Sequence, residues 1–273
     1  MNFQNASISR RSFIAGAAGL VAAGSLAGSS AAATQSLIVG ASPSPHAVIL
    51  ADYAAPILAE QGIELEVKSY TDYIQPNKDT TSGAIDANYF QHINYLNNYN
   101  EENGTDLVNV GKIHFEPMGV FAGKSSDIEN VADGATFGVP NDPTNEGRAL
   151  LLLEAQGLIT LSDSSNLSST PKDIAENPKN LTFVEVEAAT IPSIVSEVDL
   201  AVINSNYALG AGYNPVTDSL AIESSDSPYV NVLVVKEGNE DNPAIQALVE
   251  ALHSDTIRTY IEDTFDGAVV PAF

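Results

Sequence analysis

Short β-rich runs alternate with helical runs along the chain from Ser36 onward, and this alternation limits the possible folds more than any other feature. The first unit reads as a buried strand at Ser36 to Gly40, a helix with one apolar face at Ala47 to Gln61, and an alternating strand at Ile63 to Tyr70. A strand, a helix and a second strand in this order form a βαβ unit. The pattern predicts an α/β fold with mostly parallel strands.

The same alternation continues to the C-terminus. Further strands are expected at Ala87 to Phe90, Leu107 to Val110, Ala135 to Val139, Leu181 to Val186, Leu200 to Ile203 and Val230 to Val235. Further helices are expected at Ile93 to Tyr99, Pro143 to Gln156, Ile191 to Val195, Pro243 to His253 and Asp255 to Phe265. No internal repeat and no Pro/Gly linker cuts this part of the sequence into consecutive domains. Two lobes that share one interleaved chain would explain this.

The composition is that of a globular protein with an acidic surface. Of the 273 residues, 44% are hydrophobic and 17% are charged, which allows a sizeable core and argues against disorder. The formal net charge of −24 repels phosphate backbones and anionic lipid surfaces. We therefore expect no nucleic-acid partner.

The N-terminal segment reads as an export signal. Arg10 and Arg11 precede Phe13 and Ile14, and an Ala/Gly-rich apolar stretch then leads to three alanines ending at Ala33. This pattern predicts a twin-arginine signal peptide over residues 1–33, and an uncleaved membrane anchor is the alternative. The sequence contains no cysteine, so it offers no disulfide, no thiolate nucleophile and no cysteine for lipid modification.

One helix start has the features of an anion site. Asp142 is a good N-cap, Pro143 suits the first helical position, and a run of leucines follows as the buried face. Asn145 and Arg148 lie three residues apart, so they share a face near the positive end of the helix dipole. The planar guanidinium matches a carboxylate, which makes a ligand carboxylate the natural guest. The alternative is that Arg148 pairs with an acid of the protein.

Aromatic and amide side chains could complete a pocket. Tyr73, Phe90, His92 and Tyr95 follow strand ends, so their rings could converge into a wall suited to an apolar or thioether side chain. The alternative is ordinary core packing. Three asparagines border apolar runs and can donate and accept at once, which suits a zwitterion unless they serve as turn or cap residues. These are Asn204, Asn206 and Asn231.

The sequence shows no clear agent for catalysis. The four histidines form no HxH or HxxxH pair, and no nucleophile elbow or phosphate-binding glycine loop is present. His114 and Glu116 alternate on a strand and could lie side by side, but a third metal ligand is not evident. We expect no metal, no cofactor and no enzymatic activity.

Several longer motifs occur in one order between Ile38 and Phe273. They are Val39-Gly40-Ala41 with Pro45-His46, Thr71 to Asn77, Ile85 to His92, His114 to Gly119, Pro140 to Glu154, Glu176 to Leu181, Ala201 to Tyr207 and Ser227 to Asn231. With these motifs the chain resembles the methionine-binding proteins of ABC importers, the NlpA lipoprotein family.

The resemblance implies a periplasmic-binding-protein fold of type II character, with two discontinuous α/β lobes joined by two crossing strands. The crossings are expected near Met118 to Val120 and Pro228 to Val230. One lobe would comprise residues 34–118 plus 231–273, and the other residues 119–230.

The resemblance also implies a function. The protein would capture methionine, with the L-enantiomer expected, in the cleft and deliver it to a membrane permease and its ATPase. It would act as a monomer outside the cytoplasm. Tyr73, Phe90, His92 and Tyr95 would surround the ligand side chain, Asn145 and Arg148 would bind its carboxylate, and Asn204 and Asn231 would contact its backbone. His114 would be a further pocket residue.

Two alternatives stay open. The ligand could be D-methionine, methionine sulfoxide or a short peptide, because an aromatic pocket separates related apolar guests weakly. The protein could also be an exported enzyme that uses His92 or His114 as acid or base. The chain departs from the family in having no cysteine for a lipid anchor, so its attachment to the cell surface or periplasmic membrane is open.

Overall fold

The computed structural model describes residues 35–224 and 226–273, which belong to one compact unit. The predicted signal peptide over residues 1–33 lies outside the described residues. Among the helices that are described, none is long and apolar enough to span a membrane.

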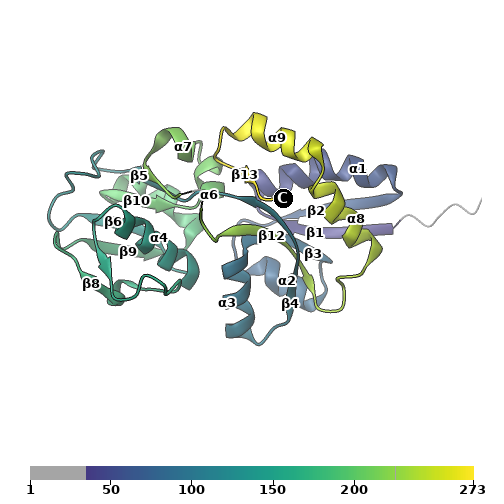
Figure 1. Cartoon of the computed structure of the whole chain (residues 1–273), viewed down its shortest axis with the longest axis horizontal. Coiled ribbons are helices and arrows are strands. Elements are labelled where there is room, and N and C mark those ends of the chain that lie inside the picture. Colours follow the sequence, from purple (N-terminus) through teal and green to yellow (C-terminus); the bar gives the residue numbers. More distant parts are fainter. Residues whose placement is uncertain (1–34, 225) are drawn as a thin grey trace, which may run out of the picture. The chain divides into compact units, whose positions relative to one another are not determined.

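A six-stranded sheet contains both the beginning and the end of the described chain (Figure 1). Its strands, in the order β13-β4-β12-β3-β1-β2, are β13 (Val270–Pro271), β4 (Leu107–Phe115), β12 (Val230–Lys236), β3 (Ala87–His92), β1 (Gln35–Ala41) and β2 (Ile63–Ser69). β1 pairs in parallel with both β2 and β3. The connection from β1 to β2 is helical and comprises η1 (Pro43–Ala47), η2 (Ile49–Ala54) and α1 (Ala55–Glu60). The predicted βαβ unit is therefore confirmed, although its helical part begins earlier than expected and contains π-type turns.

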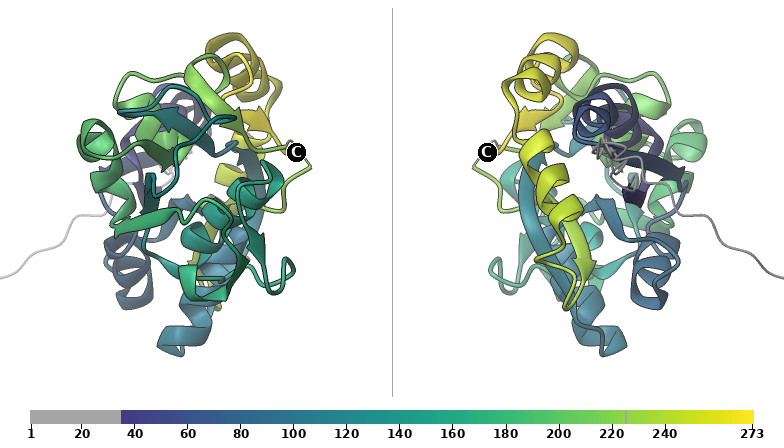
Figure 2. Two further views of the ribbon diagram at one scale, coloured as in Figure 1. Left: turned by 90° about the vertical axis from the view of Figure 1, so that its left-hand side faces the viewer. Right: turned by 90° about the vertical axis from the view of Figure 1, so that its right-hand side faces the viewer.

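Helices cover both faces of this sheet (Figures 1 and 2). One face packs against α1, α8 (Pro243–Leu252) and α9 (Asp255–Phe265), and the other against α2 (Gln75–Ser82) and α3 (Ile93–Asn103). The side chains of β12 alternate between the two cores, because successive residues of a strand point to opposite faces. Leu233 and Val235 join the core under α8, whereas Val232 and Val234 join the core under α3. Burial on both faces explains why residues Val232 to Val235 of β12 form a continuous apolar run.

The second large sheet has five strands. Its strands, in the order β11-β5-β10-β6-β9, are β11 (Ser219–Ile222), β5 (Gly119–Ala122), β10 (Leu200–Ile203), β6 (Thr136–Pro140) and β9 (Thr182–Val186). Helix α4 (Pro143–Ala155) packs its leucines on one face, and α5 (Ile191–Ile194) packs on the other. The shorter elements are β7 (Thr160–Leu161), β8 (Ile174–Glu176), α6 (Ser205–Gly210), α7 (Pro215–Asp218), η3 (Pro171–Asp173), η4 (Ala188–Thr190) and η5 (Val195–Glu197).

The chain passes between the two sheets twice. It leaves the six-stranded sheet after β4 and enters the other at β5, and it returns between β11 and β12. The two connections contact each other, since the backbone N–H of Glu223 donates to the carbonyl oxygen of Met118 at 2.9 Å. The Met118 N–H in turn donates to the Glu223 carboxylate at 3.1 Å.

The expectation of mostly parallel strands is wrong. β12 runs antiparallel to β3 and β4, β13 runs antiparallel to β4, and β5 runs antiparallel to β10 and β11. β5 and β12 enter their sheets directly from the other sheet rather than through a covering helix. Two consecutive strands of one sheet run parallel when a crossover connection, usually a helix, joins them. Sequence reasoning also missed α2 and α6, which are short or rich in polar residues.

Candidate functional site

A small cavity of about 20 Å³ lies where the two sheets meet, at the ends of β3, β10 and β12. It is lined by Tyr73, Phe90, Gln91, His92, Tyr95, Glu116, Asn145, Arg148, Asn204, Ser205, Asn206 and Asn231. A cavity of this size has room for about one water molecule. An amino acid could therefore enter only if the walls moved apart.

The structure brings eight of the nine predicted site residues to this cavity. His114 does not line it; this histidine is fully buried and lies behind Glu116, which does. Asn206, which the sequence also offered as a pocket amide, lines the cavity too. The lining further includes Gln91, Glu116 and Ser205, which sequence reasoning did not place in the ligand site.

Four rings form one wall of the cavity. The ring centroid of Tyr73 lies 5.9 Å from that of Phe90 and 6.0 Å from that of Tyr95, and Tyr95 lies 6.2 Å from His92. Phe90 and His92 are two residues apart on β3 and so point to the same face. The Tyr95 hydroxyl donates to the Tyr73 carbonyl oxygen at 2.9 Å and fixes the loop before α2 against α3. The wall is therefore held in place by strand geometry and by a hydrogen bond.

His92 also caps a helix. Its Nδ1 accepts the backbone N–H of Tyr95 at 3.0 Å, so neutral His92 carries its proton on Nε2, which lies 3.2 Å from Asn145 Oδ1. Burial, with a smaller effect of the Arg148 charge, lowers the pKa of His92 to about 3. The ring is therefore neutral near pH 7, and both of its nitrogens are already engaged.

The start of α4 has the predicted form. Asp142 is the N-cap and accepts the Asn145 N–H at 3.0 Å, and Pro143 occupies the first turn. The Asn145 amide is fully used within the protein: Nδ2 donates to the Asp142 carboxylate at 2.9 Å, and Oδ1 accepts Asn204 Nδ2 at 2.8 Å. Asn145 thus holds Asn204 and His92 in place rather than offering a free amide.

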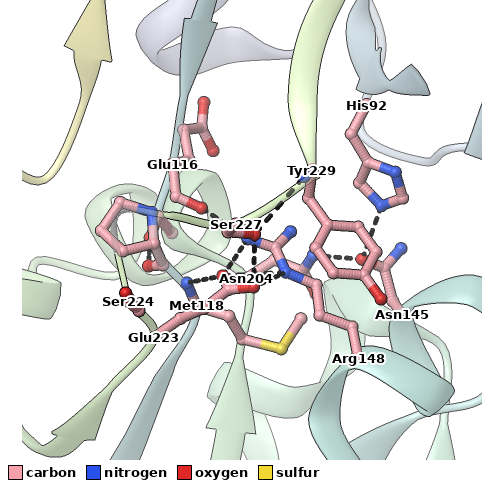
Figure 3. Close-up of polar contacts among 12 residues, drawn as sticks. His92, Glu116, Met118, Asn145, Arg148, Asn204, Glu223, Ser224, Ser227 and Tyr229 are labelled. Atoms are coloured by element: carbon pink, nitrogen blue, oxygen red, sulfur yellow. Dashed lines mark hydrogen bonds and ion pairs between the residues drawn. The ribbon is translucent and has the colours of Figure 1, made fainter. Parts of the chain in front are cut away.

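Arg148 pairs with an acid of the protein, which is the alternative that the sequence left open (Figure 3). Its Nε lies 3.0 Å from the Glu223 carboxylate, and its Nη2 donates to the same carboxylate and to the Glu116 carbonyl oxygen. The guanidinium also lies over the Tyr229 ring, 4.5 Å from its centroid. Nη1 has no hydrogen-bond partner in residues 35–224 and 226–273, although Arg148 lines the cavity. The protein therefore already uses Nε and Nη2 of the guanidinium, and Nη1 is left to bind a ligand.

Behind the cavity lies a buried chain of polar side chains. The Tyr89 hydroxyl contacts His114 Nδ1, and His114 Nε2 lies 2.7 Å from Glu116 Oε1. His46 Nε2 lies 3.0 Å from Asn231 Oδ1 and 3.6 Å from the same Glu116 oxygen. Burial lowers the pKa of His46 to about 4 and that of His114 to about 3, and it raises the pKa of Glu116. Both histidines are thus neutral near pH 7.

The sequence showed no third metal ligand beside His114 and Glu116, and the structure places His46 there. The three residues offer ligand atoms within 4.8 Å of one another and form the candidate metal group of the described chain. Two ligand atoms about 2 Å from a tetrahedral zinc ion would lie about 3.3 Å apart. The His114–Glu116 separation of 2.7 Å instead matches a hydrogen bond. The spacing thus fits a hydrogen-bonded chain better than a metal centre.

The chain is similar to proteins of known family. A family model described as NlpA lipoprotein matches residues 37–273. A probable D-methionine-binding lipoprotein MetQ of Pasteurella multocida is 42% identical over 239 residues, covering 87% of this chain and 86% of the relative. The methionine-binding lipoprotein MetQ of Bacillus subtilis is also 42% identical, over 86% of this chain and 87% of its own length.

Solved structures of lipoproteins and binding proteins are also similar to this chain in sequence and fold. A putative lipoprotein from Ruminococcus gnavus is 50% identical with a TM-score of 0.85, over 88% of this chain and 100% of its own. A nutrient binding protein from Burkholderia cenocepacia, solved bound to methionine, is 39% identical with a TM-score of 0.82, over 87% of this chain and 100% of its own.

Proposed function

The chain belongs to the NlpA lipoprotein family, and from that premise we propose that it is the substrate-binding component of an ABC importer for methionine. Its fold is the two-lobed periplasmic-binding-protein fold of these relatives, as the sequence predicted. The observation that carries the proposal is the lining of the cavity, which combines a wall of four rings with one guanidinium. A thioether packs favourably on aromatic edges, and a guanidinium binds a carboxylate.

The residues would have distinct roles. Tyr73, Phe90, His92 and Tyr95 enclose the ligand side chain, and Arg148 binds the ligand carboxylate through its free Nη1 end. Asn204 and Asn231 contact the amino-acid backbone. Asn145 holds Asn204 and His92, and His114 holds Glu116. Support for these roles comes from the lining of the cavity and from the hydrogen bonds among the lining residues.

Two lobes would open and close around the ligand. We assign residues 34–118 plus 231–273 to one lobe and residues 119–230 to the other, following the membership of the two sheets. The connections after β4 and after β11 would act as the hinge. Opening is required for entry because the cavity as it stands has no room for an amino acid, and the form closed around the ligand would be the one that the permease and its ATPase recognise.

The protein would bind without turnover and act outside the cytoplasm. Both nitrogens of His92 and of His114 are engaged, so neither imidazole is placed to move a proton of a substrate. Export by the twin-arginine signal at residues 1–33 would place the protein at the cell surface or in the periplasm, where it would work as a monomer.

Mass spectrometry of small molecules released from the denatured protein tests the proposal. We expect methionine at close to one molecule per chain. Calorimetric titration with L-methionine, D-methionine, methionine sulfoxide and a glycyl-methionine dipeptide then ranks the alternatives. A titration in which a dipeptide binds and L-methionine does not would overturn the assignment, and release of a chemically altered product would favour an enzyme.

A further inference from the structure

The cavity contains one acidic and one permanently cationic side chain among its lining residues, Glu116 and Arg148. A free amino acid carries one charge of each sign. Arg148 accounts for the carboxylate, and the proposed function gives Glu116 no role. Only 6% of Glu116 is exposed, so its carboxyl group has little contact with bulk water. A buried carboxylate is retained at a cost unless a partner of opposite charge reaches it.

The two charged groups point to different parts of the site. Glu116 turns its backbone carbonyl toward Arg148, and its carboxylate extends away from the guanidinium (Figure 3). This separation leaves the carboxylate free of the Arg148–Glu223 pair. A ligand with a carboxylate at Arg148 would have to present its positive group at another place in the cavity, and Glu116 supplies an anion there.

The surrounding side chains prepare Glu116 to accept a hydrogen bond. With the Tyr89 hydroxyl donating to Nδ1, neutral His114 carries its proton on Nε2 and donates it to Glu116 Oε1. One carboxylate oxygen is thus held from behind by a neutral donor, which orients the group without cancelling its charge. The backbone N–H of Asn206 also favours the ionised carboxylate, and no side chain of the described residues other than His114 donates a hydrogen bond to it.

A second acceptor belongs to a residue that lines the same cavity. Asn204 Oδ1 is buried without a hydrogen-bond partner among the described residues, because its amide nitrogen is turned toward Asn145. An ammonium group has three N–H donors and no acceptor. It would satisfy both Asn204 Oδ1 and the Glu116 carboxylate, whereas an acylated nitrogen would keep a single N–H and no charge.

We propose that Glu116 is the acceptor for the ligand's ammonium group and makes the site selective for free α-amino acids over N-acylated or α-hydroxy analogues. This inference rests on the proposed function, because it places the amino acid with its carboxylate at Arg148. Burial opposes ionisation of Glu116 in the empty cavity, and a bound ammonium offsets that effect, since an opposite charge favours the ionised form.

Titration calorimetry of the exported protein with L-methionine and with its α-hydroxy analogue tests the inference. Glu116→Gln keeps the shape of the side chain and an oxygen for His114 but removes the charge. We expect wild type to prefer methionine over the hydroxy analogue by about a hundredfold, and Glu116→Gln to lose methionine affinity by a similar factor while its affinity for the analogue stays within about threefold of wild type. N-acetylmethionine should bind neither protein.

Glu146→Gln is the matched control, because Glu146 is a buried acid of α4 that does not line the cavity. It should leave both affinities unchanged. Equal loss of both ligands in Glu116→Gln would indicate a structural role and overturn the inference. If Glu116→Gln does not fold, the ratio of the wild-type affinities for methionine and its hydroxy analogue decides alone. Affinities within threefold of each other would also overturn the inference. Failure of wild type to bind methionine at all would overturn the proposed function itself.

Discussion

Arg148 combines two tasks in one guanidinium. One edge is committed to Glu223, and the residue also lines the cavity. Glu223 balances the buried positive charge and at the same time prevents the side chain from rotating. Pre-orienting a donor in this way lowers the entropy lost on binding. The residue is only 4% exposed, so a bound carboxylate would meet it largely free of water.

Replacement of Arg148 by alanine should weaken methionine binding. Loss of a charge-assisted hydrogen bond costs about 2 to 3 kcal/mol, which corresponds to roughly a hundredfold in affinity. Arg258→Ala is the control, because Arg258 contacts the C-terminal Phe273 and does not line the cavity. Unchanged methionine affinity in Arg148→Ala by calorimetry would show that the carboxylate binds elsewhere.

Glu146 should make the stability of the protein depend on pH. Burial, with repulsion from Glu185, Asp142 and Asp173, raises the pKa of Glu146 from 4.5 to about 7. The folded protein therefore binds more protons than the unfolded chain between these values, and stability falls as pH rises through that window. Glu146→Gln removes the titration, so it should be more stable than wild type at pH 8 by about 1 kcal/mol after solvent screening, and equal to it near pH 4.

Chemical denaturation of both proteins at pH 4, 6 and 8 measures this difference. Glu250→Gln, at an exposed position of α8, serves as the control and should show no such trend. A constant difference between Glu146→Gln and wild type across the three pH values would contradict the assignment.

At the scale of single elements, the N-terminus of α4 organises the site. The Asp142 carboxylate caps the helix and also holds the Asn145 amide, which in turn holds Asn204 and His92. The helix start was predictable because a cap, a proline and an apolar run are adjacent in sequence. The same reasoning predicted that Asn145 contacts the ligand. In the structure its amide instead bonds to Asp142, Asn204 and His92. His92 and Asn204 are distant in sequence, so only the fold brings them within reach.

Asp142→Ala should therefore reduce both stability and affinity. Loss of an N-cap costs about 1 kcal/mol of folding free energy. Asn242→Ala removes the N-cap of α8, a helix of similar length away from the cavity, and should cost about the same stability. We expect only Asp142→Ala to lose methionine affinity as well, by about tenfold. Thermal unfolding and calorimetry on the two variants separate the effects; equal affinities would indicate that Asp142 serves the helix alone.

At the scale of the whole molecule, the Glu223 carboxylate ties the site to both connections between the sheets. It accepts from Arg148, from the Met118 backbone and from the Ser227 hydroxyl at 2.7 Å. Glu223 lies 75 residues from Arg148, and His46 lies well over sixty residues from both His114 and Glu116. Local patterns identified most residues that line the cavity, but these partners depend on contacts between segments far apart in sequence, for which a single sequence carries no local signal.

Glu223→Gln should weaken methionine binding without any contact to the ligand. The substitution keeps the side-chain volume but removes the charge that fixes Arg148, so we expect a loss of about tenfold. Ser227→Ala removes one hydrogen bond to the same carboxylate and should change affinity by less than about threefold. If Glu223 acts through Arg148, its substitution should have no further effect in the Arg148→Ala background; additive losses by calorimetry would contradict that coupling.

The tyrosines of the ring wall also provide an intrinsic fluorescence signal for ligand binding. The chain has ten tyrosines and no tryptophan, so its near-ultraviolet emission comes from tyrosine alone. Two of those tyrosines, Tyr73 and Tyr95, line the cavity, and the Tyr73 hydroxyl donates to Asn206 at 2.5 Å. A guest that enters between the rings must alter their surroundings. Occupancy of the site can therefore be followed in the unmodified protein by its intrinsic fluorescence, with no dye, tag or introduced chromophore.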